Sequence, residues 1–289
     1  MVTLKDLLRY VHVEDISGDP DVGIEGVSYD SRRVEKGHLF VCIRGEKHDG
    51  HAFASDAWER GAIAFVVERN VDLPREAVVA RVKDSRLALG FIAKSFYGDP
   101  SSKMGIIGVT GTNGKTTTTY LVKSILEEAG YLTGILGTIQ YVIGSRRLPA
   151  KHTTPESLEV QALLWEMVEA GVKYACMEVS SHALALRRVD GCRFRVGIFT
   201  NLSQDHLDFH RDMEGYFRAK ERLFLPLSRG GLQAEAAAVN VDDPYGRRLA
   251  ATATGKSMPG AIRPSTRSAT ARRSTAGSSS TEMIARRSA

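Results

Sequence analysis

Residues 108–117 read GVTGTNGKTT, and this segment determines how the rest of the chain is interpreted. An apolar run over Met104–Val109 precedes it, and a helical pattern over Lys115–Ala129 follows it, ended by Gly130. Glycines allow backbone N–H groups to approach phosphate oxygens, and the N-terminus of a helix favours a bound anion. Lys115 would then reach the β- and γ-phosphates, and the Thr116 hydroxyl would bind Mg²⁺. The segment therefore predicts a phosphate-binding loop in an enzyme that consumes ATP.

A glycine-rich turn between a strand and a helix is the simpler interpretation of the same residues. The general phosphate-loop pattern has glycine five residues before Gly114, where this chain has Val109. The apolar strand before the loop and its Gly-Lys-Thr ending favour the phosphate loop nonetheless.

Strands and helices are expected to alternate along residues 98–250. Thr133–Gly137 is expected to lead into another strand, and further strands are predicted at Tyr174–Val179, Arg195–Thr200 and Ala236–Val241. Further helices are predicted at Pro155–Ala170 and Met213–Leu225. Such alternation predicts a mostly parallel sheet with helices on both faces. Residues 98–250 are therefore expected to form a P-loop-type ATP-binding domain of the α/β class, incomplete at its C-terminal end.

Residues 1–97 are predicted to form a separate, smaller α/β domain. Its strands are expected at Leu39–Ile43, Ala62–Val67 and Val78–Val82. Asp84 is a suitable N-cap for a helix over Leu87–Tyr97, and Gly98-Asp99-Pro100 would end that helix and mark the domain boundary.

The composition changes at about residue 251. The remaining segment is rich in Ser, Thr, Ala and Arg and contains no Leu, Val or aromatic residue. It is too poor in apolar residues to bury a core, so residues 251–289 are expected to be disordered. The abrupt change indicates a truncation or a slip of reading frame.

The net charge of +5 at neutral pH comes from this last segment. Residues 251–289 contain one lysine and six arginines against one glutamate, a net charge of +6, which leaves −1 for the rest. A basic folded face for nucleic acid is therefore not expected, although nucleic-acid binding by the Arg-rich tail stays open as an alternative.

The cysteines and the apolar runs indicate the cellular compartment in which the protein is expected. Cys42, Cys176 and Cys192 are odd in number and widely spaced, which favours small buried apolar residues over disulfides or a zinc site. No run approaches the ~18 apolar residues of a membrane span, and the N-terminus lacks a signal sequence. A cytoplasmic monomer with no membrane partner is expected.

Two polar clusters follow predicted strands. Residues 177–182 read MEVSSH, and Glu178 there could hold Mg²⁺ near the phosphates, because ligands of open α/β sheets bind beyond the carboxyl ends of strands. Residues 200–210 read TNLSQDHLDFH, a loop suited to a metal or a phosphate. An ion pair, a helix cap or a solvated loop would explain each cluster alone, and Lys220 alone would be a surface charge.

Taken together, these motifs resemble the Mur ligases of peptidoglycan synthesis. The resemblance rests on the order GTNGKT at 111–116, HTTP at 152–155, EVSSH at 178–182 and NLSQDHLDFH at 201–210. Residues 29–34, YDSRRV, with GHLF at 37–40, fit the UDP-binding domain of the same family. The resemblance covers residues 1 to about 250, and the family uses the loop variant with valine at the position of Val109.

The resemblance implies roles for individual residues. ATP contacts are implied for Gly111, Thr112, Asn113, Gly114, Lys115, Thr116, Thr117 and Asn240. Contacts to the UDP-sugar peptide are implied for Tyr29, Ser31, Glu46, Lys47, His48, Thr153, Thr154, Ser180 and Arg188. Mg²⁺ ligands are implied at Thr116, Glu178, His206 and Lys220, the last as a carbamylated lysine, and catalytic roles at Lys115, Lys220 and His206.

The implied reaction joins a diamino acid to UDP-N-acetylmuramoyl-L-alanyl-D-glutamate at the expense of ATP. A substrate carboxylate takes the γ-phosphoryl group, and the amine of the diamino acid then attacks the acyl phosphate. Mg²⁺ and Lys115 would neutralise the charge between the two anions. Diaminopimelate is the commoner diamino acid of the family, and lysine is the alternative.

The sequence departs from the family after about residue 251, where nothing resembles the domain that binds the amino acid. Amide formation by this chain is therefore expected to be undetectable. Two other functions stay open, a non-catalytic binding fragment and another ligase of the superfamily such as a folylpolyglutamate synthase.

Overall fold

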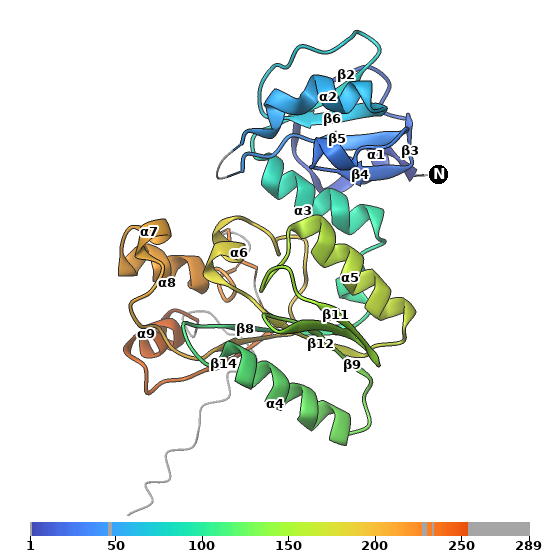
Figure 1. Ribbon diagram of the computed structural model, residues 1–289. Helices are drawn as coiled ribbons and strands as arrows, with labels where there is room; N and C mark the ends of the chain where they lie inside the picture. Colours follow the sequence, from blue (N-terminus) through green and yellow to red (C-terminus); the bar gives the residue numbers. More distant parts are fainter. Residues whose placement is uncertain (1, 46–47, 227–229, 233, 254–289) are drawn as a thin grey trace, which may run out of the picture.

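The computed structural model describes residues 2–45, 48–226, 230–232 and 234–253 (Figure 1). They form two α/β units on separate sheets, a five-stranded sheet from residues before 83 and a seven-stranded sheet from residues after 104. Glu46, Lys47 and residues 254–289 of the predicted tail lie outside the described residues. The helix Pro244–Ala253 (α9) extends into the first residues that the sequence assigned to a disordered tail, so that boundary was placed too early.

The N-terminal unit has the strand order β2-β7-β6-β5-β4. Its strands are β2 Val13–Ser17, β4 Gly26–Ser28, β5 His38–Val41, β6 Ala62–Val67 and β7 Val78–Val82, with a small separate pair, β1 Val2–Thr3 and β3 Gly23–Ile24. Strands β4 to β7 are parallel, and only β2 runs antiparallel to its neighbour.

Helices cover both faces of this sheet. They are α1 Leu4–Leu7, α2 Ala54–Glu59 and α3 Ser85–Phe96, with short 3₁₀ turns at Leu8–Tyr10, Ser31–Arg33 and Gly50–Phe53. Apolar residues of α1 and α3 share one core with the sheet, and those of α2 share the other. Asp84 caps α3 by accepting a hydrogen bond from the Leu87 N–H, as predicted, and α3 begins at Ser85 because the N-cap precedes the first helical residue.

The central unit has the strand order β11-β10-β9-β12-β8-β13-β14. The parallel strands are β8 Gly105–Thr110, β9 Thr133–Leu136, β12 Tyr174–Glu178, β13 Val196–Phe199 and β14 Ala236–Val239. The antiparallel edge consists of β10 Gln140–Ile143 and β11 Arg146–Pro149. The mostly parallel sheet that the sequence predicts is confirmed.

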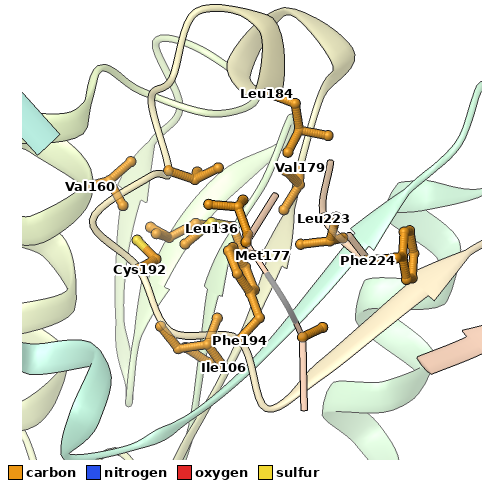
Figure 2. Packing of buried hydrophobic residues seen from close by; sticks show 14 of the residues in the cluster. Ile106, Leu136, Val160, Met177, Val179, Leu184, Cys192, Phe194, Leu223 and Phe224 are labelled. Carbon is orange, nitrogen blue, oxygen red and sulfur yellow. The ribbon is translucent and has the colours of Figure 1, made fainter. Parts of the chain in front are cut away.

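The helices of this unit are α4 Lys115–Glu128, α5 Ser157–Glu169, α6 Ser181–Ala185, α7 Leu207–His210, α8 Met213–Glu221 and α9, and a 3₁₀ turn at Pro100–Ser102 leads into β8. Figure 1 shows α4 on one face of the sheet and α5 and α6 on the other. The main core fills the second face, where Met177 and Phe194 belong to one apolar cluster with residues of α5 and α8. Figure 2 shows Met177 beside Phe194, with Val160 of α5 and Phe224 farther out. Both faces are therefore covered, as expected for parallel strands.

The two units meet along helices α3 and α5, which pack side by side (Figure 1). In the central unit the parallel strands β8, β12 and β13 end at the same edge of the sheet. The loops that follow them therefore gather at one place, and these are the loops that carry the predicted motifs.

Two minor expectations can also be compared with the structure. All three cysteines are free and buried, as predicted, and burial raises the pKa of the Cys192 thiol to about 12. Among the described residues, no helix combines the length and apolarity that crossing a bilayer requires.

Candidate active site

The loop between β8 and α4 is held in shape by the residues that follow β13. Thr200 Oγ1 donates to the Asn113 carbonyl at 2.7 Å, and the Asn113 N–H donates to Asn201 Oδ1 at 3.0 Å. Gly111 has φ +148°, and a Cβ at this position would lie 1.9 Å from Thr200 Oγ1. Glycine is therefore required at residue 111, because any side chain would displace the contact that shapes the loop.

Lys115 begins α4, and its side chain folds back over the loop. Its Nζ donates to the carbonyl oxygens of Gly111 at 3.0 Å and Thr112 at 2.8 Å. Burial lowers the pKa of Lys115, and the nearby carboxylates of Glu178 and Asp205 oppose that shift. The ammonium thus lies at the mouth of the loop. A bound triphosphate would replace the two carbonyls as its hydrogen-bond acceptor.

Hydroxyl groups surround the carboxylate of Glu178 at the end of β12. Thr116 Oγ1 donates to Glu178 Oε2 at 2.9 Å, and the backbone N–H of Thr138 donates to Oε1 at 2.9 Å. The Thr138 hydroxyl lies 3.1 Å from Oε2 and 3.0 Å from the Thr153 hydroxyl. These are hard oxygen donors, the kind that Mg²⁺ prefers, and Mg²⁺ usually takes only one or two carboxylates and completes its shell with waters and phosphate oxygens.

Lys220 lies in the interior, next to the same loop. Its side chain is 1% exposed, and its Nζ donates to the Gly111 carbonyl at 2.8 Å. The Nζ also lies 4.5 Å from the centre of the Tyr216 ring. Burial, and then the neighbouring ammonium of Lys115, lower the pKa of Lys220 well below its usual value. The two lysines that the sequence predicts as catalytic therefore meet at one carbonyl oxygen.

His206 lies on the outer side of this cluster among aromatic rings. Its ring centre is 4.8 Å from that of His182 and 6.1 Å from that of Tyr216, whose hydroxyl lies 3.2 Å from Thr112 Oγ1. His206 Nε2 is 3.4 Å from Asp205 Oδ2. Within the described part of the chain, no group of three or more His, Cys, Asp or Glu side chains is arranged to hold a metal ion. The role of His206 as a Mg²⁺ ligand, which the family resemblance implies, stays a prediction.

The remaining ATP residues predicted from the sequence lie around the loop. Thr117 is in the exposed first turn of α4. Asn240 follows β14, and its Nδ2 donates to the Thr200 carbonyl at 2.8 Å. Gly114 has φ +84° and precedes the first residue of α4. Asn240 is thus coupled to the loop through Thr200.

A cavity of about 890 Å³ lies between the two units. We call it the inter-unit cavity. Four residues predicted to bind substrate line it, Tyr29, Ser31, His48 and Arg188, as do Arg32, Arg60, Arg86, His152 and Glu156. The predicted residues Glu46 and Lys47 lie outside the described residues.

Three further substrate residues connect this cavity to Glu178. Thr154 Oγ1 donates to the Glu178 carbonyl at 2.7 Å, and the Ser180 N–H donates to Thr154 Oγ1 at 3.2 Å. Arg188 Nη1 donates to the Thr154 carbonyl at 3.2 Å. Thr153 lies beside Thr138, as described above. A continuous line of polar contacts therefore runs from the phosphate loop to the inter-unit cavity.

Several residues of this arrangement are missing from the sequence interpretation. Thr138 follows β9 at the same edge as the other motifs, so its position after a strand is a usable signal. Tyr216 and Arg86 lie inside helices, where a tyrosine or an arginine is usually packing or surface charge. Glu156 follows HTTP directly and reads as an ordinary helix N-terminus.

Known proteins that resemble this chain match it over most of the described residues. The family described as Mur ligase middle domain matches residues 109–285, and the family described as Mur ligase family, catalytic domain, matches residues 23–97. The UDP-N-acetylmuramoyl-L-alanyl-D-glutamate–2,6-diaminopimelate ligase of Geobacter sulfurreducens is 51% identical over 252 residues, 86% of this chain and 50% of that relative. The ligase of the same name from Geobacter metallireducens is 47% identical over 264 residues, 91% of this chain and 52% of the relative.

A solved structure of a ligase with this name superposes with a TM-score of 0.75 at 28% identity, over 90% of this chain and 51% of that one. The chain spans about half the length of the curated relatives it matches.

Proposed function

The chain belongs to the Mur ligase family, and from that premise we propose that it binds ATP and UDP-N-acetylmuramoyl-L-alanyl-D-glutamate for ligation of a diamino acid. The observation that carries the proposal is the line of contacts from Thr116, the neighbour of Lys115 in the loop, through Glu178 and Thr154 to Arg188. It joins a phosphate loop to a cavity large enough for a nucleotide sugar, so one substrate carboxylate can reach the γ-phosphate.

The ATP side of the proposal rests on the loop and the two lysines. Lys115 would leave the Gly111 and Thr112 carbonyls for the β- and γ-phosphates, and the loop N–H groups would hold the phosphate oxygens. Thr116 and Glu178 would hold Mg²⁺, which supplies Lewis-acid stabilisation of the charge on the transferred phosphoryl group. The residues predicted from the sequence keep their proposed roles, His206 and Lys220 among them as further Mg²⁺ ligands.

The substrate side rests on the inter-unit cavity. Ser31, His48 and Tyr29 would contact the uridine end, and Thr153, Thr154, Ser180 and Arg188 the sugar-peptide end. The basic residues of the cavity, among them Arg32, Arg60 and Arg86, suit a diphosphate. The glutamyl carboxylate would then lie toward Glu178 and Lys115.

Two features of the chain's own residues suit acyl phosphate formation. Lys115 is a cation held between the places proposed for the two anions, where it would offset their repulsion. The low pKa of Lys220 favours its neutral amine, which adds to carbon dioxide and releases a proton to give a carbamate. A carbamate at this position would face the loop as an anion and replace the cation that now contacts Gly111.

The diamino acid that we propose is meso-diaminopimelate. The relatives at 47% and 51% identity carry the name of 2,6-diaminopimelate ligases, and lysine is the other candidate. We also propose a cytoplasmic monomer without a membrane or nucleic-acid partner, and a division between units at Gly98-Asp99-Pro100.

Calorimetric titration tests the substrate side directly. We expect UDP-N-acetylmuramoyl-L-alanyl-D-glutamate to bind one site per chain, and more tightly than UDP, because only the larger ligand reaches Thr154 and Arg188. Dihydrofolate is the control ligand, since a folylpolyglutamate synthase would bind a folate instead. Binding of dihydrofolate without binding of the nucleotide sugar would contradict the proposal.

A further inference from the structure

Three charged side chains cross the wall of the inter-unit cavity in a row. Arg86 of α3 donates from Nη1 to Glu156 Oε2 at 2.9 Å, and Arg188 Nε lies 3.5 Å from the same oxygen. Their side chains are 16%, 12% and 22% exposed in the order Arg86, Glu156, Arg188. One carboxylate of the central unit thus holds two guanidinium groups, one from each unit.

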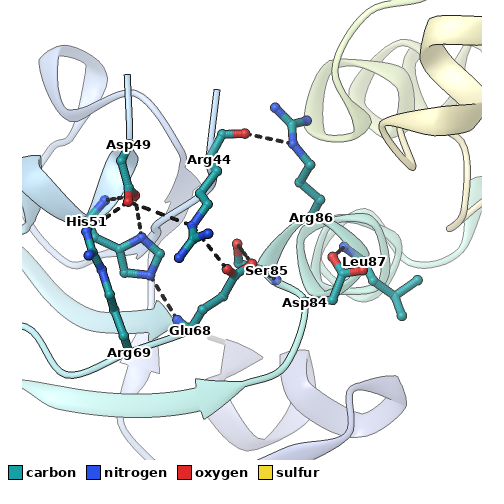
Figure 3. Close-up of polar contacts among 9 residues, drawn as sticks. All are labelled: Arg44, Asp49, His51, Glu68, Arg69, Asp84, Ser85, Arg86 and Leu87. Carbon is teal, nitrogen blue, oxygen red and sulfur yellow. Dashed lines mark hydrogen bonds and ion pairs between the residues drawn. The ribbon is translucent and has the colours of Figure 1, made fainter. Parts of the chain in front are cut away.

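Arg86 also contacts the loop that carries the uridine-end residues. Its Nε donates to the Arg44 carbonyl at 2.9 Å (Figure 3). The Arg44 side chain in turn lies 3.6 Å from the carboxylate of Glu68, which accepts hydrogen bonds from the N–H and the hydroxyl of Ser85. Arg44, at the start of this loop, is therefore fixed to the N-terminus of α3.

The far end of the same loop is fixed by a second set of contacts (Figure 3). Asp49 accepts hydrogen bonds from the His51 N–H at 3.0 Å and from Arg69 at 2.8 Å. The Glu68 N–H donates to His51 Nε2 at 2.9 Å. His48, which we place at the uridine end, lies between these two anchored ends.

Glu156 contacts the other end of the cavity as well. Arg188, its second partner, donates to the carbonyl of Thr154, a residue that we place at the sugar-peptide end. Arg188 Nε is buried and makes no hydrogen bond, and its charge is balanced by the Glu156 carboxylate at 3.5 Å. Arg188 therefore connects Glu156 to the residue that we place at the sugar-peptide end.

We infer that Glu156 is a positioning residue that joins the uridine end of the cavity, through Arg86 and Arg44, to the sugar-peptide end, through Arg188 and Thr154. The inference rests on the proposed function, because it assumes that one nucleotide-sugar ligand spans both ends. Two guanidinium groups on one carboxylate leave a net positive charge on the wall, which a diphosphate would neutralise. Glu156 thus sets the distance between the two arginines rather than contacting the ligand itself.

The test compares two ligands, UDP and UDP-N-acetylmuramoyl-L-alanyl-D-glutamate, in the parent chain and in Glu156→Gln. Glutamine keeps an oxygen for the N-cap contact to the Ser157 N–H and removes the charge that holds the arginines. We expect the Kd of the larger ligand to rise about tenfold and that of UDP by less than about threefold, since only the larger ligand spans both ends. A general destabilisation of the fold would weaken the binding of both ligands alike. An equal rise in Kd for the two ligands would therefore overturn the inference.

Asp84→Asn is the matched control. It removes another ion pair between the units, that of Asp84 with Arg187 at 2.7 Å, while asparagine keeps the N-cap of α3. Arg187 does not line the inter-unit cavity within the described residues, and we expect both Kd values to stay within about twofold of the parent. A rise in the Kd of the larger ligand in Asp84→Asn equal to that in Glu156→Gln would overturn a specific role for Glu156.

The double variant Arg86→Gln/Glu156→Gln tests whether the two residues act through one contact. We expect its Kd for the larger ligand to rise by a smaller factor than the product of the factors for Arg86→Gln and Glu156→Gln, because residues of one contact are not additive. Additive losses would contradict the inference. Failure of the parent chain to bind the nucleotide sugar would contradict the proposed function and the inference together, whereas equal binding by parent and Glu156→Gln would contradict the inference alone.

Discussion

Lys115→Ala is expected to weaken ATP binding by about 30-fold to 1,000-fold, corresponding to about 2–4 kcal/mol. The ammonium lies at the mouth of the phosphate loop, partly buried, and within the described residues it donates its hydrogen bonds to two backbone carbonyls of the loop itself. A triphosphate would replace those neutral partners with charged ones, and charge-assisted hydrogen bonds are the stronger kind. Alanine removes that contact and leaves the phosphates without their main counter-charge.

Calorimetry with ATP and Mg²⁺ measures this loss. The control is Lys123→Ala, which removes a lysine from the same helix that pairs with Glu127 instead of facing the loop. Binding of UDP should stay within about twofold in both variants, because the inter-unit cavity does not include either lysine. Equal ATP affinity in parent and Lys115→Ala would show that the loop does not hold the triphosphate.

Gly111→Ala is expected to lower the free energy of unfolding by about 2–4 kcal/mol and to abolish measurable ATP binding. The backbone at this residue has φ +148°, and the new Cβ would lie 1.9 Å from Thr200 Oγ1. Thr200 would have to give up its hydrogen bond to the Asn113 carbonyl, so the loop would lose its shape. Urea unfolding and ATP calorimetry on the same preparation measure the two effects.

Gly130→Ala separates backbone strain from the clash. Gly130 has φ +83°, and a Cβ there would meet nothing within 4 Å. We expect Gly130→Ala to lower the free energy of unfolding by about 1 kcal/mol. ATP affinity should stay unchanged, because Gly130 lies beyond the far end of α4. If both variants lost the same stability and both bound ATP as the parent does, the steric account of Gly111 would be wrong.

The fold was largely predictable where buried strands form continuous apolar runs in the sequence. Strands β6 and β7 have the predicted bounds, and β8, β12 and β13 lie within a residue or two of theirs, because buried parallel strands are continuous apolar runs. The hairpin of β10 and β11 was missed, since Arg146 and Arg147 make its second strand polar. Its signal was the turn at Gly144, which has φ +58° between paired residues Ile143 and Arg146.

The candidate site was predictable only in part, because some of its residues lie at strand ends and others depend on packing between helices. Motif residues at strand ends, such as Glu178, were found because parallel strands bring their carboxyl ends together. Lys220 could be singled out only through the resemblance to the family, since one lysine in an amphipathic helix carries no local signal of burial. Arg86 and Glu156 were missed because their meaning depends on packing between α3 and α5, which sequence patterns do not specify.

Relaxation of the bound nucleotide sugar by Mn²⁺ tests the central claim most directly, since Mn²⁺ replaces Mg²⁺ and its effect on nearby protons falls steeply with distance. The protein is saturated with UDP-N-acetylmuramoyl-L-alanyl-D-glutamate, and Mn²⁺ with a non-hydrolysable ATP analogue is added. We predict that the glutamyl protons relax much faster than the uracil protons, and that Glu178→Gln suppresses the effect. Faster relaxation of the uracil protons, or none at either end, would contradict a carboxylate held beside the phosphate loop.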